Sequence, residues 1–258
     1  MAMKKKTKGN ITAPSLPGKD MLAEVNNNEA GNIYNSLFAK NRKVEYDNKD
    51  IALVNIRTNP DNQIFRAMDD DEDIRILAED IKRNGLMHNL VVFPEQEEGS
   101  TVYVLLSGER RFRALNYLQE KGDATWNIVN CNVVTTPLAE NEKKVLLYSA
   151  NLQVRGGFSD EAIRRQAIAE FITCLQREPY NMSREEALNA TKSVSTVNPR
   201  TIERDARIEE KLKGKLKTLL NDKFLTRSEC ETYLRFEADK QDEIANRFEK
   251  LQAVDCHS

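Results

Sequence analysis

The sequence has few of the side chains that bind metals or form disulfides. Its 258 residues include four cysteines, two histidines and one tryptophan. The cysteines stand at positions 131, 174, 230 and 256 without the paired spacing of zinc, iron–sulfur or redox sites, and His88 is far from His257. We therefore expect buried free thiols, no structural metal and no histidine-based catalytic triad.

Long hydrophobic runs and a strong excess of one charge are also missing. No apolar stretch approaches the roughly 18–20 residues of a membrane span, and no apolar segment follows the basic start Lys4-Lys5-Lys6 as it would in a secretory signal. These absences predict a cytoplasmic protein without a membrane partner. The net charge is −2, from 39 basic and 41 acidic residues, so contact with a nucleic acid would have to use local basic patches.

Composition and pattern divide the chain into three parts. Residues 1–48 are polar and patternless, which predicts a flexible tail with at most a short helix near residues 33–38. Residues 49–155 mix apolar runs typical of strands with helical patterns. The glycine pair at 156–157 suggests a hinge, and residues 156–258 read as helical throughout.

The middle part predicts an α+β domain. Strands are expected over residues 51–56, 90–93, 102–106 and 127–134, and a long helix follows Pro137. The acidic run 69–73 precedes a helix that ends at Asn84-Gly85. It is consistent with a metal site, but its position favours helix capping and complementation of the helix dipole.

The segment Ser107-Gly108-Glu109-Arg110-Arg111-Phe112-Arg113 lies between a predicted strand and a predicted helix. A glycine turn of this kind points backbone N–H groups and the positive end of the helix dipole at one place, which suits an anion. Three arginines add donors for phosphate oxygens. We therefore predict a phosphate-binding turn; the alternative is a surface helix with solvated arginines.

The last part predicts a helix-turn-helix. Ser183 to Glu186 forms a capping box, residues 193–197 form a turn, and Asn198-Pro199 opens a second helix. Recognition helices read base edges with their first turns. The candidate DNA-binding residues are Arg184, Ser195, Thr196, Asn198, Arg200, Thr201, Arg204 and Arg207, and the lysines from Lys211 to Lys217 continue the positive charge. The alternative is a helical bundle with solvated arginines.

The stretch Gly-Glu-Arg-Arg-x-Arg-Ala after a strand resembles the signature of the ParB partition proteins, and the similarity extends over roughly residues 49–155. The resemblance implies an α+β N-terminal ParB/sulfiredoxin-like domain followed by an all-α helix-turn-helix DNA-binding domain. It also implies a CTP pocket lined by Ser107, Gly108, Glu109, Arg110, Arg111 and Arg113. Sulfiredoxin chemistry is not expected, because no cysteine lies between Val102 and Leu118.

A second family box, Glu-Asn-x-Gln-Arg, is matched in part by Asn151, Gln153 and Arg155, with Ala150 in place of the glutamate. Alanine cannot ligate Mg²⁺, a hard cation that prefers oxygen ligands. Glu109 and Asn151 remain as candidate Mg²⁺ ligands, and CTP hydrolysis is at most weak.

The resemblance further implies double-stranded DNA as a partner, a partition ATPase of the ParA type bound through the tail, and a homodimer. The expected function is sequence-specific DNA binding in plasmid, chromosome or mobile-element segregation, at the nucleoid or on a plasmid. Two alternatives stay open: a transcriptional regulator without nucleotide switching, and a nuclease.

Overall fold

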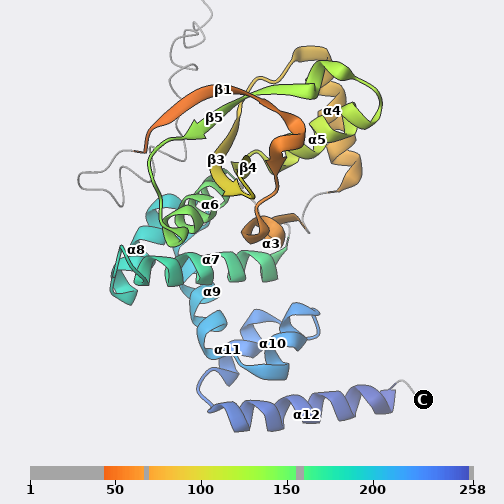
Figure 1. The fold of residues 1–258 in the computed structure, drawn as a ribbon. Helices are drawn as coiled ribbons and strands as arrows, with labels where there is room; N and C mark the ends of the chain where they lie inside the picture. The colour runs from red at the N-terminus through yellow and green to blue at the C-terminus, as the bar shows by residue number, and fades with distance from the viewer. Residues whose placement is uncertain (1–43, 67–69, 155–159, 256–258) are drawn as a thin grey trace, which may run out of the picture.

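The structure, a computed structural model, describes residues 44–66, 70–154 and 160–255. A five-stranded sheet with its helices occupies one end of the molecule, and helices alone form the other end (Figure 1). This arrangement confirms the prediction of an α+β domain followed by an all-α part. The predicted helix near residues 33–38 and the glycine pair 156–157 lie outside the described residues.

The sheet is mixed, with the strand order β1-β5-β3-β4-β2. The strands are β1 (Tyr46–Ala52), β2 (Ile56–Arg57), β3 (Leu90–Glu97), β4 (Ser100–Ser107) and β5 (Ile128–Val134). The pairs β1–β5 and β3–β4 are antiparallel, whereas β3–β5 and β2–β4 are parallel. A bulge between Val91 and Val92 shifts the register beside the end of β4.

Two expected boundaries at the start of the sheet were wrong. β1 begins at Tyr46, so residues 46–48 belong to the sheet and not to the tail. Most side chains of this edge strand are exposed and polar, and such a strand carries no hydrophobic alternation from which to predict it. The single strand expected over residues 51–56 is interrupted by a 3₁₀ turn, η1 (Leu53–Asn55), which exposes Val54.

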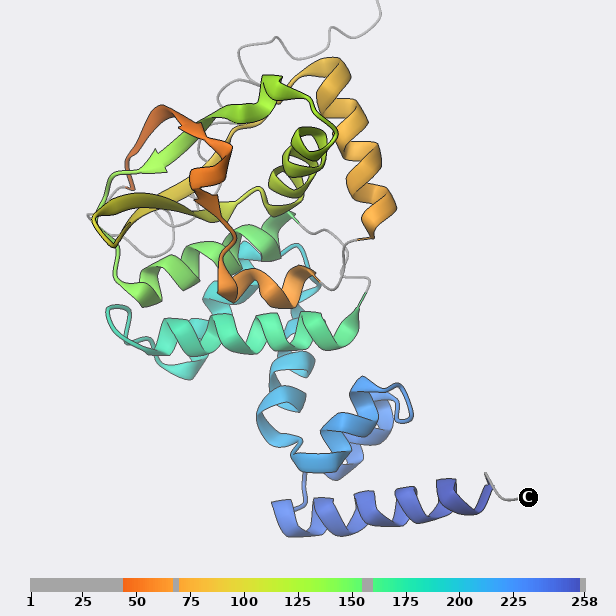
Figure 2. The ribbon, with the colours of Figure 1, turned by 45° about the vertical axis from the view of Figure 1, so that its right-hand side comes forward.

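Helices cover both faces of the sheet (Figure 2). Helices α4 (Asp71–Asn84) and α5 (Glu109–Glu120) pack on one face, where their apolar sides meet Leu90, Val92, Leu105 and Val129. Asp70 caps α4 by accepting from the Glu72 N–H at 3.0 Å, and Gly85 ends it with φ 79°. The acidic run therefore begins a helix, as its position favoured.

Helix α6 (Glu140–Val154) lies on the opposite face and has two apolar sides. Leu146 and Leu147 pack against the sheet at Phe93 and Val104. Val145, Tyr148 and Leu152 point the other way into a second cluster, the shared helical core. That core joins Phe65 of α3 (Gln63–Arg66) and the three α6 residues to apolar side chains of α7, α8 and α9.

The helical part begins with three helices that pack on one another: α7 (Glu161–Gln176), α8 (Arg184–Val194) and α9 (Pro199–Lys211). Three more follow: α10 (Gly214–Asn221), α11 (Arg227–Tyr233) and α12 (Ala238–Asp255). The last three enclose a C-terminal core around Leu212, Leu216, Leu220 and Cys230. Within the described residues, no helix is both long and apolar enough to cross a membrane.

Candidate functional site

The turn between β4 and α5 requires glycine. Gly108 has φ 103° and ψ 22°, in the left-handed region that favours glycine. A Cβ atom at this position would lie 2.7 Å from Leu90 Cδ2 and 3.3 Å from Arg111 Nη2. Gly108 is also the N-cap of α5 and has no side chain to cap the first N–H groups of the helix. The predicted strand–glycine–helix turn is therefore present, with the geometry that suits an anion.

Arg111 holds the neighbouring backbone. Its Nη1 donates to the carbonyl oxygens of His88 at 2.5 Å and Asn89 at 2.9 Å. Burial lowers the pKa of the Arg111 guanidinium, which nevertheless remains protonated at neutral pH. Arg111 thus fixes the chain before β3 against the turn, and its positive charge remains at the turn.

Arg110 and Arg113 face the start of α4. Arg113 Nη2 lies 3.0 Å from Asp71 Oδ1, and Arg110 Nη2 lies 3.7 Å from Asp73 Oδ2. Both aspartates are largely exposed, and exposed ion pairs contribute little to stability. A phosphate group can therefore compete for these two arginines at small cost. The third expected donor, Arg111, has a structural role that the sequence did not indicate.

The remaining predicted residues at this turn differ in exposure. Ser107 is half-buried at the end of β4, whereas Glu109 is buried in the first turn of α5, with 6% of its surface exposed. A buried carboxylate is a poor ligand for a hydrated Mg²⁺ ion. Within the described ranges, no group of three or more histidine, cysteine, aspartate or glutamate side chains is placed to hold a metal ion.

The second predicted box lies at the end of α6. Asn151 Nδ2 donates to Leu147 O at 2.9 Å and to Asn62 Oδ1 at 3.3 Å. Gln153 is half-buried, and its Oε1 has no hydrogen-bond partner within the described residues. Ala150 is buried and offers no oxygen ligand from its side chain. Arg155 lies outside the described residues.

The direction of α6 brings this box toward the glycine turn. Near the start of the helix, Lys143 Nζ lies 3.1 Å from Glu95 Oε1 and 4.3 Å from the centre of the Phe93 ring, close to the end of β3. Asn151 is about 12 Å further along the helix axis. Leu147 belongs to the apolar cluster against which Val91, at the beginning of β3, packs. The end of α6 therefore runs toward the edge of the sheet at which Arg111 binds the residues preceding β3.

Comparison with protein families agrees with this geometry. The family model of the ParB N-terminal domain matches residues 37–140. This chain has a ParB N-terminal domain. The match covers the strand–glycine–helix turn, whereas the box at the end of α6 lies beyond it.

Solved ParB structures are also similar to the chain. The C-terminally truncated chromosome-partitioning protein ParB from Caulobacter crescentus, complexed with CTP-gamma-S, is 18% identical, and the alignment covers 78% of this chain and 98% of that one with a TM-score of 0.34. The form complexed to the centromeric parS site is 16% identical, and the alignment covers 77% of this chain and 89% of that chain with a TM-score of 0.30. A Pnob8-like ParB-N domain is 11% identical, and the alignment covers 80% of this chain and 98% of that chain with a TM-score of 0.46. No curated protein matches the chain.

Beyond the ParB N-terminal domain, α8 and α9 form the predicted helix-turn-helix pair. Ser183 and Glu186 make the capping box of α8, and the Asn198 side chain caps α9 by accepting from the Arg200 N–H at 2.9 Å. Ile202 and Ala206 of α9 pack into the shared helical core. These contacts leave the opposite side of α9 facing solvent.

Four cations line the solvent-facing side of α9. They recur at helical spacing, which places them on one face, and we call them the α9 cation stripe: Arg200, Arg204, Arg207 and Lys211. Arg200, Arg207 and Lys211 are exposed, and Arg204 is half-buried. A cationic helix face beside a helix-turn-helix turn is the expected electrostatic surface for the DNA backbone.

Other candidate DNA contacts have different roles. The Ser195 hydroxyl and the Thr196 N–H both donate to the carbonyl oxygen of Leu152, each at 3.4 Å, so the turn of the helix pair is bound to the end of α6. Arg184 forms an ion pair with Glu210 of α9 at 2.8 Å. Thr201 is half-buried, and Asn198 is exposed at the cap.

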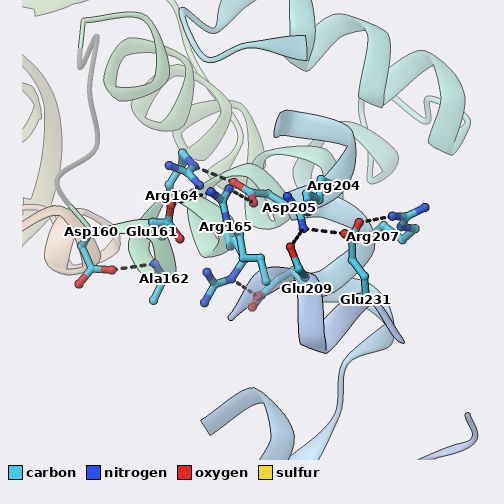
Figure 3. A network of polar contacts seen from close by, with 12 residues as sticks. Asp160, Glu161, Ala162, Arg164, Arg165, Arg204, Asp205, Arg207, Glu209 and Glu231 are labelled. Atoms are coloured by element: carbon cyan, nitrogen blue, oxygen red, sulfur yellow. Dashed lines mark hydrogen bonds and ion pairs between the residues drawn. The ribbon is translucent and has the colours of Figure 1, made fainter. Parts of the chain in front are cut away.

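A buried polar network lies behind the stripe, where α7 meets α9 and α11 (Figure 3). Asp205 is fully buried, and its Oδ2 accepts from Arg164 Nε at 2.6 Å, while Arg227 Nη1 lies 3.6 Å from its Oδ1. Arg165, also buried, donates to Asn221 Oδ1 at 2.6 Å, and burial lowers the pKa of its guanidinium. The network joins α7 and α9 to α10 and α11.

Three cysteines are buried free thiols, as expected for Cys131 and Cys174. Burial raises the pKa of each thiol to about 11, including that of Cys230 in α11. Such thiols are poor nucleophiles at neutral pH. Cys256 lies outside the described residues.

Proposed function

We propose that this protein is a sequence-specific DNA-binding partition protein that uses a CTP-type nucleotide at the Gly108 turn. The observation that carries the proposal is the α9 cation stripe on a helix-turn-helix that shares a core with a ParB N-terminal domain. The proposed partner is double-stranded DNA in the cytoplasm, at a plasmid or nucleoid. Segregation of a plasmid, chromosome or mobile element is the process that this combination suits.

DNA reading is assigned to the exposed face of α9. In this proposal Arg200, Arg204 and Arg207 contact base edges or phosphates from the recognition helix, and Lys211 contacts a phosphate. Asn198 and Thr201 contribute polar contacts near the helix start. Arg184, Ser195 and Thr196 support the helix pair through Glu210 and the Leu152 carbonyl, so their effect on DNA binding is indirect.

Nucleotide binding is assigned to the start of α5 together with the end of α6. The N-terminus of α5, Arg110 and Arg113 would bind phosphate oxygens, while Arg111 holds the turn in shape. Asn151 and Gln153 would approach from the end of α6, and Arg155, outside the described residues, is proposed as a further phosphate ligand. Any Mg²⁺ would be bound mainly by the nucleotide phosphates and water, because the chain offers few oxygen ligands here. The choice of CTP rests on the family resemblance of residues 107–114.

Equilibrium binding of labelled CTP tests the nucleotide part. Saturable binding is expected from the wild-type chain, with at least about a tenfold weaker affinity in Arg110→Ala and Arg113→Ala, since each removes a charged hydrogen bond to phosphate. Gly108→Ala should abolish binding. Arg75→Ala removes an exposed arginine of α4 that pairs with Glu72 and is the matched control. Absence of saturable binding by the wild-type chain would favour the regulator without a nucleotide switch.

Selection from a pool of randomised duplexes tests the DNA part. Enrichment of one motif is expected, and loss of that enrichment in Arg200→Ala would assign the reading to α9. Equal affinity for all sequences would remove the claim of specificity.

Incubation of supercoiled plasmid with Mg²⁺ or Mn²⁺ tests the nuclease alternative, which nicking by the wild-type chain would support.

We propose three segments, residues 1–48, 49–155 and 156–258, with the first strand reaching back to Tyr46. The tail would bind a partition ATPase of the ParA type, and the chain would act as a homodimer. Co-sedimentation with such an ATPase before and after removal of residues 1–43 tests the first statement, and sedimentation equilibrium tests the second.

A further inference from the structure

One carboxylate outside the helix-turn-helix binds half of the α9 cation stripe. Glu231 of α11 lies with Oε2 2.6 Å from Arg204 Nη2 and with Oε1 2.5 Å from Arg207 Nη2 (Figure 3). Arg204 Nη2 also donates to Ser228 Oγ at 3.1 Å. Each oxygen of a single carboxylate therefore forms an ion pair with a different arginine of the face proposed to meet DNA.

The fold holds this carboxylate in place. A capping box of Thr226 and Glu229 starts α11, and the buried Cys230 beside Glu231 anchors the helix in the C-terminal core. Arg227 at the other end of α11 lies 2.8 Å from Glu161 and 3.6 Å from the buried Asp205. Glu231 is thus presented to α9 by a rigid element.

Stabilisation of the fold does not explain why Glu231 pairs with Arg204 and Arg207. The side chains of Arg204, Arg207 and Glu231 are 30%, 52% and 28% exposed, and ion pairs with that much solvent contribute at most about 1 kcal/mol. Other acidic residues of α9 pair away from the stripe: Glu203 with Lys192 and Glu210 with Arg184, both on α8. Glu231 is the carboxylate in the described residues that bridges two stripe cations.

We infer that Glu231 is a specificity-determining residue that competes with DNA phosphates for Arg204 and Arg207. A carboxylate presents two anionic oxygens to guanidinium groups much as a phosphate does. Glu231 therefore lowers the affinity of α9 for any duplex. A duplex binds tightly only when its base contacts with α9 offset the loss of these ion pairs. This inference rests on the proposed DNA-binding function.

The test compares Glu231→Gln with Glu243→Gln in the full chain. Glu243 of α12 also bridges two cations, Lys240 and Arg247, but none of the stripe, so the control has the same change of charge and a similar loss of ion pairs. Binding is measured to an unselected duplex and to the selected motif across a salt series. Glu231→Gln should bind the unselected duplex about three- to tenfold more tightly, with a salt slope steeper by about 1–2. The ratio of specific to unselected affinity should fall, and Glu243→Gln should match the wild type.

Two results would overturn the inference. One is an unchanged affinity of Glu231→Gln for the unselected duplex; the other is weaker binding to both duplexes, which would mean that Glu231 orients the arginines for contact. Circular dichroism melting confirms that the variant is folded, and Glu231→Asp, which keeps the charge, should restore wild-type discrimination if the carboxylate is responsible.

A second readout separates this inference from the proposed function. On heparin-agarose, a sulfated polyanion, Glu231→Gln should elute at higher salt than the wild type and Glu243→Gln. If the wild-type chain bound no duplex at all, the proposed DNA function would fail while the heparin shift still showed competition for the stripe. Identical elution of all three proteins would overturn the inference whatever the DNA result.

Discussion

Helices α7 and α9 both carry paired arginines, but the two pairs lie in opposite environments. Arg164 and Arg165 of α7 lie behind α9, near the fully buried Asp205, whereas Arg204 and Arg207 of α9 lie on its outer side with the partly exposed Glu231. Each set combines guanidinium and carboxylate groups at similar distances. The two sets differ in their exposure to solvent. Buried ionic groups depend on their protein partners, whereas exposed ionic groups can exchange those partners for water or another ion.

Removing the buried carboxylate should have the largest effect. Asp205→Ala removes the buried carboxylate that accepts from Arg164 and lies near Arg227, and the loss of one partner from a buried pair costs about 3–5 kcal/mol. The midpoint of urea unfolding should fall accordingly. Asp205→Asn keeps the size and some hydrogen bonding, and should cost less. If Glu231→Gln, measured in parallel, destabilised the protein as much as Asp205→Ala, the contrast between the two environments would be wrong.

Truncating an exposed arginine of α9 should have little effect on stability and a large effect on DNA binding. Arg207→Ala should change the free energy of unfolding by no more than about 0.5 kcal/mol, since exposed substitutions rarely cost more. The same variant should weaken duplex binding by about tenfold and reduce the salt slope by about 1, which titration at several salt concentrations measures. Arg247→Ala, an exposed arginine of α12, is the control and should bind as the wild type does.

The labelling rate of the Cys230 thiol can test whether the buried network holds α11 in place. Its pKa of about 11 leaves roughly a thousandth of the thiol ionised at pH 8, and burial hinders access as well. Labelling by a disulfide reagent, located by mass spectrometry, should therefore be slow in the folded chain. It should be faster in Asp205→Ala than in Arg207→Ala. Equal rates would indicate that the buried network does not hold α11 in place.

Acid should act weakly through the exposed helix caps. Hydrogen bonds from Ser183 and Thr226 lower the pKa of Glu186 and Glu229 below the ordinary 4.5. Their contribution is therefore present above pH 4.5 and is lost as the pH falls through the lowered pKa values. The melting temperature should drop slightly more between pH 5 and pH 3 in the wild type than in Glu186→Gln combined with Glu229→Gln. Glu185→Gln, in the first turn of α8 outside the capping box, should behave as the wild type.

Structural features formed by residues close together in the chain could be predicted from the sequence. Both capping boxes, the Asn198-Pro199 start of α9 and the glycine turn after β4 are local patterns, and all are present. The separate helix α10 was not predicted. Its lysines were assigned to the positive surface, although Leu216, Leu219 and Leu220 at helical spacing after Gly214 indicate a buried side.

Contacts between distant residues could not be predicted in this way. The role of Arg111 depends on the approach of His88 and Asn89, 23 and 22 residues earlier. The pairing of Arg204 and Arg207 with Glu231 depends on where α11 packs. Sequence patterns identify donors and acceptors, but only packing decides which of them meet.

The shared helical core has a practical consequence for dissecting this protein. Phe65 of α3 and Val145, Tyr148 and Leu152 of α6 precede the glycine pair at 156–157, yet they pack with α7, α8 and α9, which follow it. Cutting the chain at those glycines would leave two fragments, each with an apolar surface bare to water and prone to aggregate. A soluble DNA-reading fragment would have to include α6, so subcloning should not follow the glycines.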